Sequence, residues 1–536
     1  MSLSTYYHTI KYLKAEQLWF QIYYKLRAKV RCVLGKKEQY TFYREGHRIS
    51  FIPFPEKSVS YRGENMFCFL NQTYRFEGTW DERTWSALWR YNLNYMDFIL
   101  QPSLEVADGV TWIDRFIDAI DSNKIASDPY PISLRGINWI KFVSLHWENL
   151  SDEKRKKIDT SLYSQYRVLT QRVERHLLAN HYLENGLSLL FASIYFRDTK
   201  FWDKAKDIVE KQLDEQILHD GAHYELSPMY HCIILERVLD CLNLLHEVDD
   251  TLFEGVKSLK SLLQEKACKM LAWLDAIVVA DDRIPLLNDS AYGVALSPKE
   301  LRDYATRMGL CWRSGVLDDS GYRRVVRTHY ETILDMAPLG VSYNLGHAHA
   351  DTGTFLLWVN GHELLVDAGT STYNAGDHRN YERSTCAHNT VVVDDENSSK
   401  VWGAFRCAQR ARVTIEADGP ELFTLSHDGY SDKGITLRRT FVCKQESMEI
   451  TDMVQGKGDA SHKAKAYFHL APDVKILQVE KHRVVTDKAM FSFREHDAIQ
   501  IINRCVAKEY NSLQPSVCVQ VEFHDTLTTI IEGFER

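Results

Sequence analysis

The chain has 536 residues, of which 45% are hydrophobic and 26% charged, and its formal net charge is −8. These values are typical of a globular protein, and the length is sufficient for two large domains. The acidic balance and the lack of a long basic run argue against a nucleic-acid partner. An anionic ligand remains compatible with local basic clusters such as "HRNYERS" at residues 378–384.

Eleven cysteines are scattered through the chain without a CxxC motif, which favours reduced core residues and a reducing compartment. No segment approaches the ~18 consecutive apolar residues of a membrane-spanning helix, so no membrane span is expected. The first residues, "MSLSTYYHTIKYLKAEQLWF", lack the apolar run of a signal peptide. We therefore expect a cytoplasmic location, with a periplasmic or secreted one left open if the N-terminus was trimmed. No oligomeric state is predicted.

The first part of the chain, up to about residue 320, has helical periodicity. In "YHCIILERVLDCLNLLHEV" and "LFEGVKSLKSLLQEKACKMLAWLDAIV", apolar residues recur every three or four positions. Short polar stretches separate such segments, as in helical hairpins that pack in sequence. We assign residues 1–325 to a helical domain.

From about residue 338 the apolar residues alternate instead. "TFLLWVNGHELLVDAGT" predicts a β-hairpin with the two-residue turn Asn360-Gly361. Many short strands separated by turn residues follow, which indicates an antiparallel β-sandwich. We assign residues 326–536 to this domain. No low-complexity linker separates the two domains, so we expect them to pack directly against each other.

Polar residues share one face of a predicted helix in "HLLANHYLENG". His176, Asn180 and Glu184 are four residues apart, and His181 is one step round the helix. Such a face forms a solvated stripe, a buried polar network, or a groove whose Asn and His side chains donate hydrogen bonds to an anionic group.

A tyrosine follows a turn in "DGAHYELSPMYH". Asp-Gly begins a turn, Ser-Pro breaks the chain, and Tyr230 opens the next helix. Tyr230 is either an amphipathic core residue or a proton carrier. The second role is favoured if nearby cations lower its pKa from about 10.

The segment "GHAHADTGT" places His347, His349 and Asp351 at alternate positions, and Asp367 and His388 follow on later predicted strands. Three His and Asp groups from successive strands form a ligand set that suits zinc and leaves one position for water. The spacing is not that of a contiguous zinc motif.

The predicted strand register places a condition on this metal site. If Asn360-Gly361 is the hairpin turn, Asp367 lies opposite Thr354, and His349 points to the other face of the strand. A joint metal site therefore requires the strand to break at "DTG", residues 351–353.

These segments, in this order, resemble the heparinase II/III family of polysaccharide lyases and the related alginate lyases. The resemblance covers roughly residues 75–460 and is most specific at "GHAHADTGTFLLWVNGHELLVDAGT" and "HNTVVVD". It implies an α+β multidomain fold, with an N-terminal incomplete α/α toroid followed by a C-terminal antiparallel β-sandwich. It also implies cleavage of uronate-containing polysaccharides by β-elimination, which leaves a 4,5-unsaturated sugar.

The resemblance implies roles for individual residues. Asn180 and His181 match the pair that binds the uronate carboxylate, and Tyr230 and His347 match the catalytic tyrosine and histidine. The metal ligands, for a zinc ion with a mainly structural role, are His349, Asp367 and His388. The substrate-binding candidates are Glu184, Tyr373, Tyr381 and Arg383.

The chemistry of β-elimination explains these residue types. The C5 proton of a uronate is weakly acidic, and hydrogen bonds to the carboxylate stabilise the enolate-like intermediate. A base removes that proton, and an acid protonates the oxygen that leaves C4. Tyr230 and His347 are suited to these tasks, and the sequence does not say which of them is the base. Zinc would stabilise the loop that holds His347 without supplying a nucleophile.

Three other functions remain open. A glycoside hydrolase would need two acids flanking the scissile bond, for which Glu184, Asp220 and Glu225 are available. A zinc-dependent glycan hydrolase would use a metal-activated water. A non-catalytic glycan-binding or polysaccharide-assembly protein would bind without turnover.

The sequence does not specify the polysaccharide, because heparin- or heparan-sulfate-like glycans, alginate and bacterial exopolysaccharides all contain uronates. Recognition of sulfate would need arginines clustered by the fold. The candidates, which are equally suited to be surface charges, are Arg379, Arg383, Arg406 and Arg410.

Overall fold

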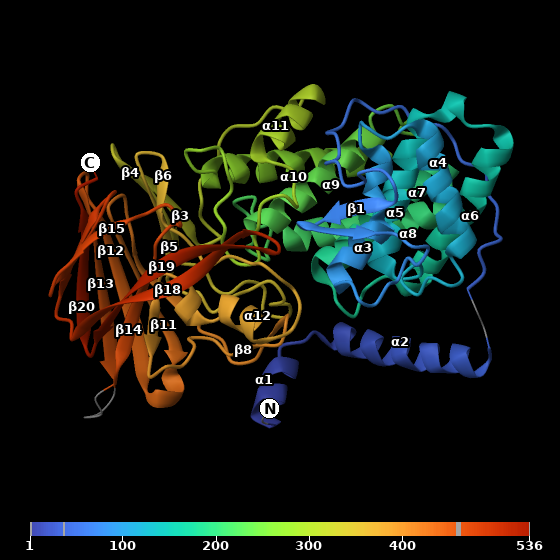
Figure 1. Ribbon diagram of the computed structural model, residues 1–536. Coiled ribbons are helices and arrows are strands. Elements are labelled where there is room, and N and C mark those ends of the chain that lie inside the picture. The colour runs from blue at the N-terminus through green and yellow to red at the C-terminus, as the bar shows by residue number, and fades with distance from the viewer. Residues whose placement is uncertain (1–2, 36–37, 457–461, 535–536) are drawn as a thin grey trace.

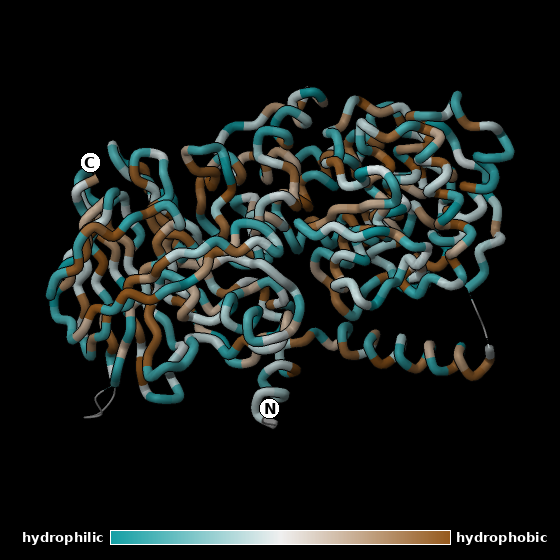
Figure 2. The backbone as a smooth tube through the Cα atoms, viewed as in Figure 1, coloured by the Kyte–Doolittle hydropathy of each residue, from teal (hydrophilic) through white to brown (hydrophobic). Residues whose placement is uncertain are grey.

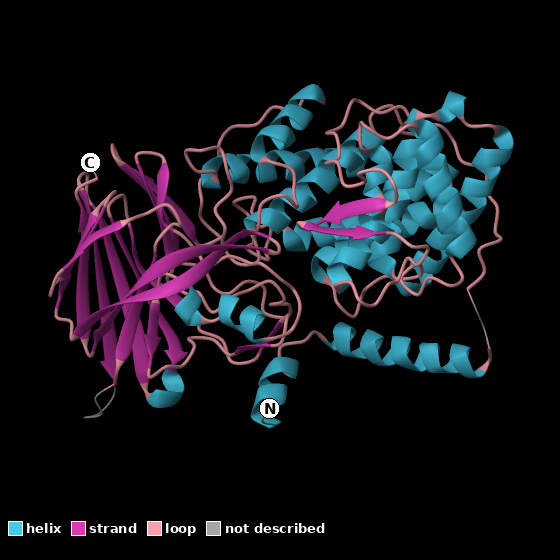
Figure 3. Cartoon of the chain, in the orientation of Figure 1, coloured by secondary structure: helices cyan, strands magenta, loops and turns pink. Residues whose placement is uncertain are grey.

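The structure, a computed structural model, describes residues 3–35, 38–456 and 462–534. Helices make up the N-terminal part of the chain and antiparallel sheets the C-terminal part, and the two parts lie side by side (Figures 1 and 3). The predicted order, a helical domain followed by a strand domain, is confirmed.

The helical domain is built from successive helices that pack against one another. α7 lies at its centre and contacts α5, α8 and α9. Every residue of α7 except His181 is buried, which is the environment that a largely apolar helix requires. The helices of this domain are α3 (Ala87–Tyr95), α4 (Val106–Ala119), α5 (Pro129–Leu145), α6 (Asp152–Arg172), α7 (Ala179–Phe196), α8 (Thr199–Gln216), α9 (Pro228–Leu244), α10 (Val256–Ile277) and α11 (Pro298–Arg307).

The start of α9 is fixed by the predicted Ser-Pro break. The Ser227 hydroxyl accepts a hydrogen bond from the Tyr230 backbone N–H at 3.3 Å, and Pro228 occupies the first helical position. A serine cap followed by proline satisfies the free N–H groups of the first turn and pre-sets its backbone angle. Tyr230 is thereby held on the first turn of the helix.

Two further helices, α1 (Leu3–Ile10) and α2 (Ala15–Val33), lie outside this bundle (Figure 1). α2 touches the bundle along one face, where the Tyr24 hydroxyl donates to the Val173 carbonyl at 2.7 Å. A short hairpin, β1 (Met66–Phe69) and β2 (Gln72–Arg75), also belongs to the N-terminal part. In the described part of the chain, no helix is long and apolar enough to cross a membrane.

The C-terminal domain is a set of packed antiparallel sheets. An eight-stranded sheet has the order β10-β11-β12-β13-β20-β17-β16-β15, and two four-stranded sheets have the orders β18-β19-β14-β7 and β3-β4-β5-β6. Side chains alternate between buried and half-buried along β12, as expected for strands with one face on a core. The strands of the three sheets are β3 (Tyr322–Val326), β4 (Tyr330–Asp335), β5 (Phe355–Val359), β6 (His362–Leu365), β7 (Val391–Val393), β10 (Val413–Asp418), β11 (Leu422–Tyr430), β12 (Ile435–Cys443), β13 (Ser447–Gly456), β14 (Ala464–His469), β15 (Ile476–Val479), β16 (Arg483–Thr486), β17 (Met490–Arg494), β18 (Ala498–Glu509), β19 (Ser512–Phe523) and β20 (Thr526–Glu532).

The two domains pack directly, as predicted. The Tyr322 hydroxyl of β3 donates to the Leu226 carbonyl at 2.6 Å, and the hydroxyls of Tyr224 and Tyr343 lie 3.0 Å apart. Side chains of β5 also join the hydrophobic core of the helical domain. The predicted division between residues 325 and 326 falls inside β3.

The β5–β6 hairpin turns at Asn360-Gly361 as predicted, but its register differs from the expectation. Leu357 pairs with Leu365 while Trp358 pairs with Glu363, so a bulge shifts the register by one residue. The predicted pairing of Asp367 with Thr354 is therefore wrong.

The expected break of the strand is present before β5. β5 begins at Phe355, and residues 346–354 precede it as a loop. Gly353 in this loop has a φ of +77°, a backbone conformation that favours glycine. The loop is therefore not bound to the alternating orientations of a strand.

Gly369 provides a test of the packing beside this loop. It has a φ of +78°, and a Cβ there would lie 1.8 Å from the Ala507 carbonyl oxygen, whereas Gly361, with the same φ, has open space. We predict that Gly369→Ala lowers the free energy of unfolding by at least about 2 kcal/mol, from strain and overpacking together. Gly361→Ala should cost about 1 kcal/mol, from strain alone. Urea unfolding compares the two variants, and equal losses would contradict the prediction.

Candidate active site

The predicted residues His347 and His349 lie where the two domains meet. The loop 346–354 brings His347 and His349 against a second loop, 284–292, that connects α10 to α11. The Asp289 backbone N–H donates to the His347 carbonyl at 3.1 Å, and the His349 backbone N–H donates to the Asn288 side chain at 2.9 Å. These bonds join the sandwich loop to the helical domain.

Asp289 is a fully buried carboxylate at the centre of this contact. Its Oδ2 lies 2.9 Å from Nδ1 of His347, and its Oδ1 lies 2.8 Å from Nε2 of His349. The Arg379 guanidinium contacts both oxygens at 2.6 Å. Burial acts to raise the Asp289 pKa, but Arg379 and the histidines outweigh it and hold this pKa well below its ordinary value. The charged carboxylate thus favours a proton on Nδ1 of His347 and leaves Nε2 of that ring free to accept one.

Tyr230 lies directly on His347. The two rings are stacked with centroids 3.9 Å apart and an angle of 29° between their planes. The Tyr230 hydroxyl is 3.2 Å from the hydroxyl of Tyr373, and Tyr510 packs on the Tyr373 ring. Burial, together with the neighbouring Tyr510, raises the Tyr230 pKa well above its ordinary value. The raised pKa favours the protonated phenol, so the condition considered from the sequence, a pKa lowered by nearby cations, is not met.

Asn180 and His181 lie on the first turn of α7, next to this stack. The Asn180 backbone N–H donates to one oxygen of Glu225 at 3.2 Å, and the other oxygen of Glu225 lies 3.8 Å from Nε2 of His347. His181 is paired with Glu174 at 3.1 Å. Burial acts to lower the His181 pKa, but Glu174 outweighs it and raises the pKa. His181 is thus suited to carry a positive charge beside the stack.

Glu184, one helical turn further along α7, points into the helical domain. It is fully buried and lies 3.4 Å from the Arg237 guanidinium. Burial raises its pKa to about 7. Its contact with Arg237 makes Glu184 a support for the helix that carries Asn180 and His181, rather than a residue of the substrate surface.

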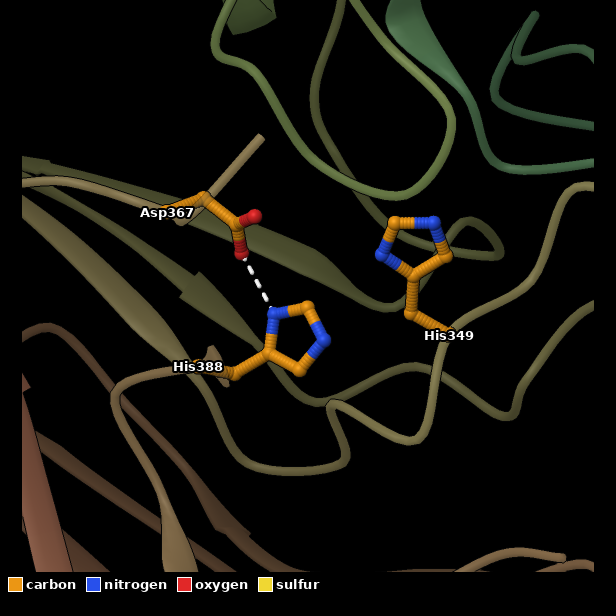
Figure 4. Close-up of side chains that lie close together, drawn as sticks. All are labelled: His349, Asp367 and His388. Carbon is orange, nitrogen blue, oxygen red and sulfur yellow. Dashed lines mark hydrogen bonds and ion pairs between the residues drawn. The ribbon is translucent and has the colours of Figure 1, made fainter. Parts of the chain in front are cut away.

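The three predicted metal ligands lie together (Figure 4). His349, Asp367 and His388 are buried, and one ligand atom from each lies within 4.8 Å of the others. Asp367 Oδ2 is 2.6 Å from Nδ1 of His388. Among the described residues, Nδ1 of His349 and Nε2 of His388 are buried without a hydrogen-bond partner. Two unpartnered imidazole nitrogens beside a carboxylate fit a divalent cation.

Two of the predicted substrate-binding residues face elsewhere. Arg383 is fully buried and donates to backbone carbonyls, including that of Ala348 at 2.9 Å, so it holds the histidine loop and has no face for a substrate. Tyr381, on α12 (Asp377–Glu382), lies against the guanidinium of Arg504. Tyr373 is instead the sandwich tyrosine that joins Tyr230. The full burial of Arg383 therefore contradicts the prediction that it binds substrate, whereas the role of Tyr381 stays a prediction.

The candidate sulfate-binding arginines do not form one cluster. Arg379 is paired with Asp289, and Arg383 is bound to carbonyls. Arg406 is exposed and lies over the Trp402 ring, and Arg410 bonds to the Ser342 carbonyl. At least two of the four thus serve the fold.

Asp289 is the central residue that the sequence did not reveal. It follows an apolar run in "LLNDSAY", between α10 and α11, and is 58 residues from His347. Asn288, which adopts a positive φ of 54°, signals a turn but no chemistry. Asp351 acts through its backbone, since its carbonyl accepts the Thr354 N–H at 2.8 Å. This bond braces the start of β5.

Family models match most of the chain. The Heparinase II/III N-terminus matches residues 133–307, and the Heparinase II/III-like C-terminal domain matches residues 312–532. The chain belongs to the heparinase II/III-like family. The predicted resemblance is thereby confirmed, and the two matches meet where the helical part gives way to the strands.

Two curated relatives of this family member are heparin-sulfate lyases. One, from Bacteroides stercoris, is 23% identical over 342 residues, which are 54% of this chain and 50% of the relative. The other, from Pedobacter heparinus, is 24% identical over 255 residues, which are 41% of this chain and 36% of the relative. The chain thus spans half or less of the curated relatives it matches.

Solved structures of the family confirm the fold. A heparinase III aligns with a TM-score of 0.63 at 16% identity, over 83% of this chain and 76% of that one. The heparan sulfate lyase of Pedobacter heparinus aligns with a TM-score of 0.55 at 16% identity, over 87% and 81%. The predicted architecture, an incomplete α/α toroid followed by a β-sandwich, is the architecture of this chain.

The buried carboxyl of Glu184 predicts a pH dependence of stability. Its pKa is raised by burial to about 7 in the folded protein, compared with about 4.3 in an unfolded chain. Between these values the folded state binds more protons than the unfolded state, so stability falls as pH rises from about 4.5 to 7. We predict that Glu184→Gln makes the free energy of unfolding fall less steeply over this range. Urea unfolding at several pH values measures the slope, and an unchanged slope would contradict the prediction.

Proposed function

We propose that this protein is a polysaccharide lyase that cleaves a uronate-containing glycan by β-elimination. The observation that carries the proposal is the stack of Tyr230 on His347 at 3.9 Å, assembled across the domain interface beside Asn180 and His181. The names of the curated relatives, both heparin-sulfate lyases, support the same reaction class.

The hydrogen bonds support a division of the roles of acid and base. Asp289 accepts the Nδ1 proton of His347, so Nε2 of this ring is available to remove the C5 proton. Tyr230, whose pKa is raised by burial, holds its proton and donates it to the oxygen that leaves C4. Tyr373, 3.2 Å away, orients the Tyr230 hydroxyl.

The helical domain supplies the groups that stabilise negative charge. The uronate carboxylate gains charge as the C5 proton leaves, and donors that are already in place lower the energy of that state. His181, whose pKa is raised by Glu174, offers a charged donor, and Asn180 offers an amide. These two residues begin a helix, whose N-terminal end also favours an anion.

The rival hydrolase mechanisms fit the geometry less well. A glycoside hydrolase would need two of the candidate acids beside the stack, but Glu184 faces Arg237 and Asp220 accepts the backbone N–H groups of Asp318 and Ser320. Of the three candidates, this leaves Glu225 near His347 without a second acid. The three metal-ligand side chains are at most 3% exposed, an enclosure that suits a structural ion better than one that activates water on a polymer. A lyase that uses Tyr230 and His347 is therefore the preferred function.

The preferred substrate class is a glycan like heparin or heparan sulfate, because both curated relatives carry that name. Alginate-like and other bacterial uronate polymers remain in the same chemical class. Arg379 and Arg383, two candidates for sulfate recognition, are engaged inside the protein. We therefore expect the enzyme to cleave polymers that carry little or no sulfate.

A panel of uronate polysaccharides tests this proposal. We expect the wild-type protein to release a product that absorbs ultraviolet light at the new C4–C5 double bond. Tyr230→Phe should lower kcat by about a hundredfold or more, because the proton donor is lost. Tyr330→Phe, at a buried tyrosine of the sandwich that bonds to the Lys444 carbonyl, is the matched control and should retain activity. If wild type cleaves no uronate polymer, or Tyr230→Phe cleaves as fast, the proposal fails.

We further propose that His349, Asp367 and His388 hold a zinc ion, because imidazole and carboxylate ligands suit zinc better than calcium or magnesium. When bound, the ion supplies a fixed positive charge that cross-links three segments of the sandwich. Its effect on the reaction is indirect. His349 shares Asp289 with His347, so a rigid His349 helps to keep His347 in place.

Metal analysis tests the zinc proposal. After incubation with zinc and dialysis, the wild-type protein should retain about one ion per chain, and chelation should lower its melting temperature. His388→Ala should retain none and be insensitive to chelation. His482→Ala, at an exposed histidine of the sandwich, is the matched control. Equal zinc content in wild type and His388→Ala would refute the site.

A further inference from the structure

Helix α2 presents an apolar stripe to the solvent. The stripe, which we call the α2 stripe, repeats at intervals of three and four residues and therefore follows one helix face. Its side chains are between 44% and 86% exposed, and they are Trp19, Ile22, Tyr23, Leu26, Val30 and Val33. Along α2, hydrophobic and hydrophilic segments alternate accordingly (Figure 2). An exposed apolar surface of this length marks an interaction site.

The remaining faces of the two N-terminal helices are anchored to both domains. On α2, the Gln17 side chain donates to the Leu177 carbonyl at 3.2 Å, and Tyr24 bonds to the neighbouring loop. On α1, the Thr9 hydroxyl accepts a hydrogen bond from the Trp402 indole at 3.2 Å. These anchors hold α2 with its stripe facing away from the protein. The stripe therefore does not pack against the hydrophobic core of either domain.

The charge of these helices differs from that of the rest of the chain. Residues 3–34 contain six lysines and arginines and a single acid, Glu16, whereas the whole chain has a net charge of −8. Lys25 and Lys29 are exposed on α2, and the helical repeat places them along one edge of the stripe. A local excess of positive charge on an acidic protein points to an anionic partner.

We propose that the α2 stripe binds to the surface of an anionic phospholipid bilayer, with α2 lying in the plane of the interface. Tryptophan and tyrosine favour the boundary between headgroups and acyl chains, and leucine and valine insert beside them. Lysines at the edge of such a helix extend their charged ends to lipid phosphates. The proposal stands independently of the lyase function.

A second copy of the chain fits the stripe less well. If two stripes packed face to face in antiparallel orientation, Lys25 and Lys29 would lie near the same residues of the other copy, and like charges at an interface oppose association. A bilayer with negative lipids instead satisfies the apolar stripe and the lysines together. The single short helix would bind reversibly, since a lone amphipathic anchor does not insert as a spanning helix does.

Vesicle flotation with the full-length protein tests this proposal. We expect the protein to float with vesicles of phosphatidylglycerol and phosphatidylcholine, and at least about tenfold less with phosphatidylcholine alone. Lys25→Glu with Lys29→Glu should weaken binding about tenfold or more, and Trp19→Ser with Leu26→Ser should abolish it. The matched controls, at exposed residues of the sandwich, are Lys481→Glu and Leu477→Ser, and both should float like wild type.

Three measurements keep the outcome decisive. Every substituted side chain is exposed, so we expect the variants to fold. Their melting temperatures, compared with that of the wild type, check this. Sedimentation velocity asks whether the stripe joins two copies. The proposal would be overturned if the protein did not float with anionic vesicles at low salt. It would also be overturned if the protein bound no vesicles but self-associated, and Leu26→Ser abolished that self-association. If variants that no longer bind vesicles still cleave uronate polymers, the lyase function does not depend on membrane binding. The two proposals can therefore fail separately.

Discussion

The site depends on one buried carboxylate that binds three side chains from two segments of the other domain. Asp289, from the helical domain, contacts His347, His349 and Arg379 of the sandwich domain. A buried charge is stable only when it is paired and hydrogen-bonded, so the domains must meet for Asp289 to be satisfied. The pairing therefore couples the domain interface to the position of His347.

In the proposed mechanism, the reaction is divided between the two domains. The helical domain contributes Tyr230 and the donors Asn180 and His181, while the sandwich contributes His347 and Tyr373. Glu225 contacts both sides, at the Asn180 backbone and near His347. Neither domain alone contains the proposed acid, the proposed base and the proposed carboxylate-binding groups. A polymer that lies along the junction would meet all of them at once.

The sequence predicts what depends on local pattern and misses what depends on three-dimensional contact. The change of periodicity, the Asn360-Gly361 turn and the Ser-Pro start of α9 are local, and each is present. The predicted pairing of Asp367 was wrong because the alternation of apolar residues does not reveal a β-bulge. Asp289 was missed because no spacing rule links it to histidines far along the chain.

Arg383 shows the same limit from the other direction. Its place in a basic segment suggested a substrate contact, but the side chain turns inward to backbone carbonyls of the histidine loop. The sequence does not distinguish an arginine that donates to backbone carbonyls from one that binds a sulfate. The burial of the side chain in the structure distinguishes them. The grouping of His349, Asp367 and His388 was predicted because the family resemblance supplied it, which spacing alone did not.

The most direct test of this account is the turnover of Asp289→Asn on a polymer that the wild type cleaves. The amide keeps the shape of the carboxylate but loses the charge that orients His347. We predict that kcat falls by about a hundredfold or more while KM changes little, and that the loss persists in Asp289→Asn with Arg379→Met, which removes the unpaired guanidinium. A kcat close to that of the wild type would contradict the account.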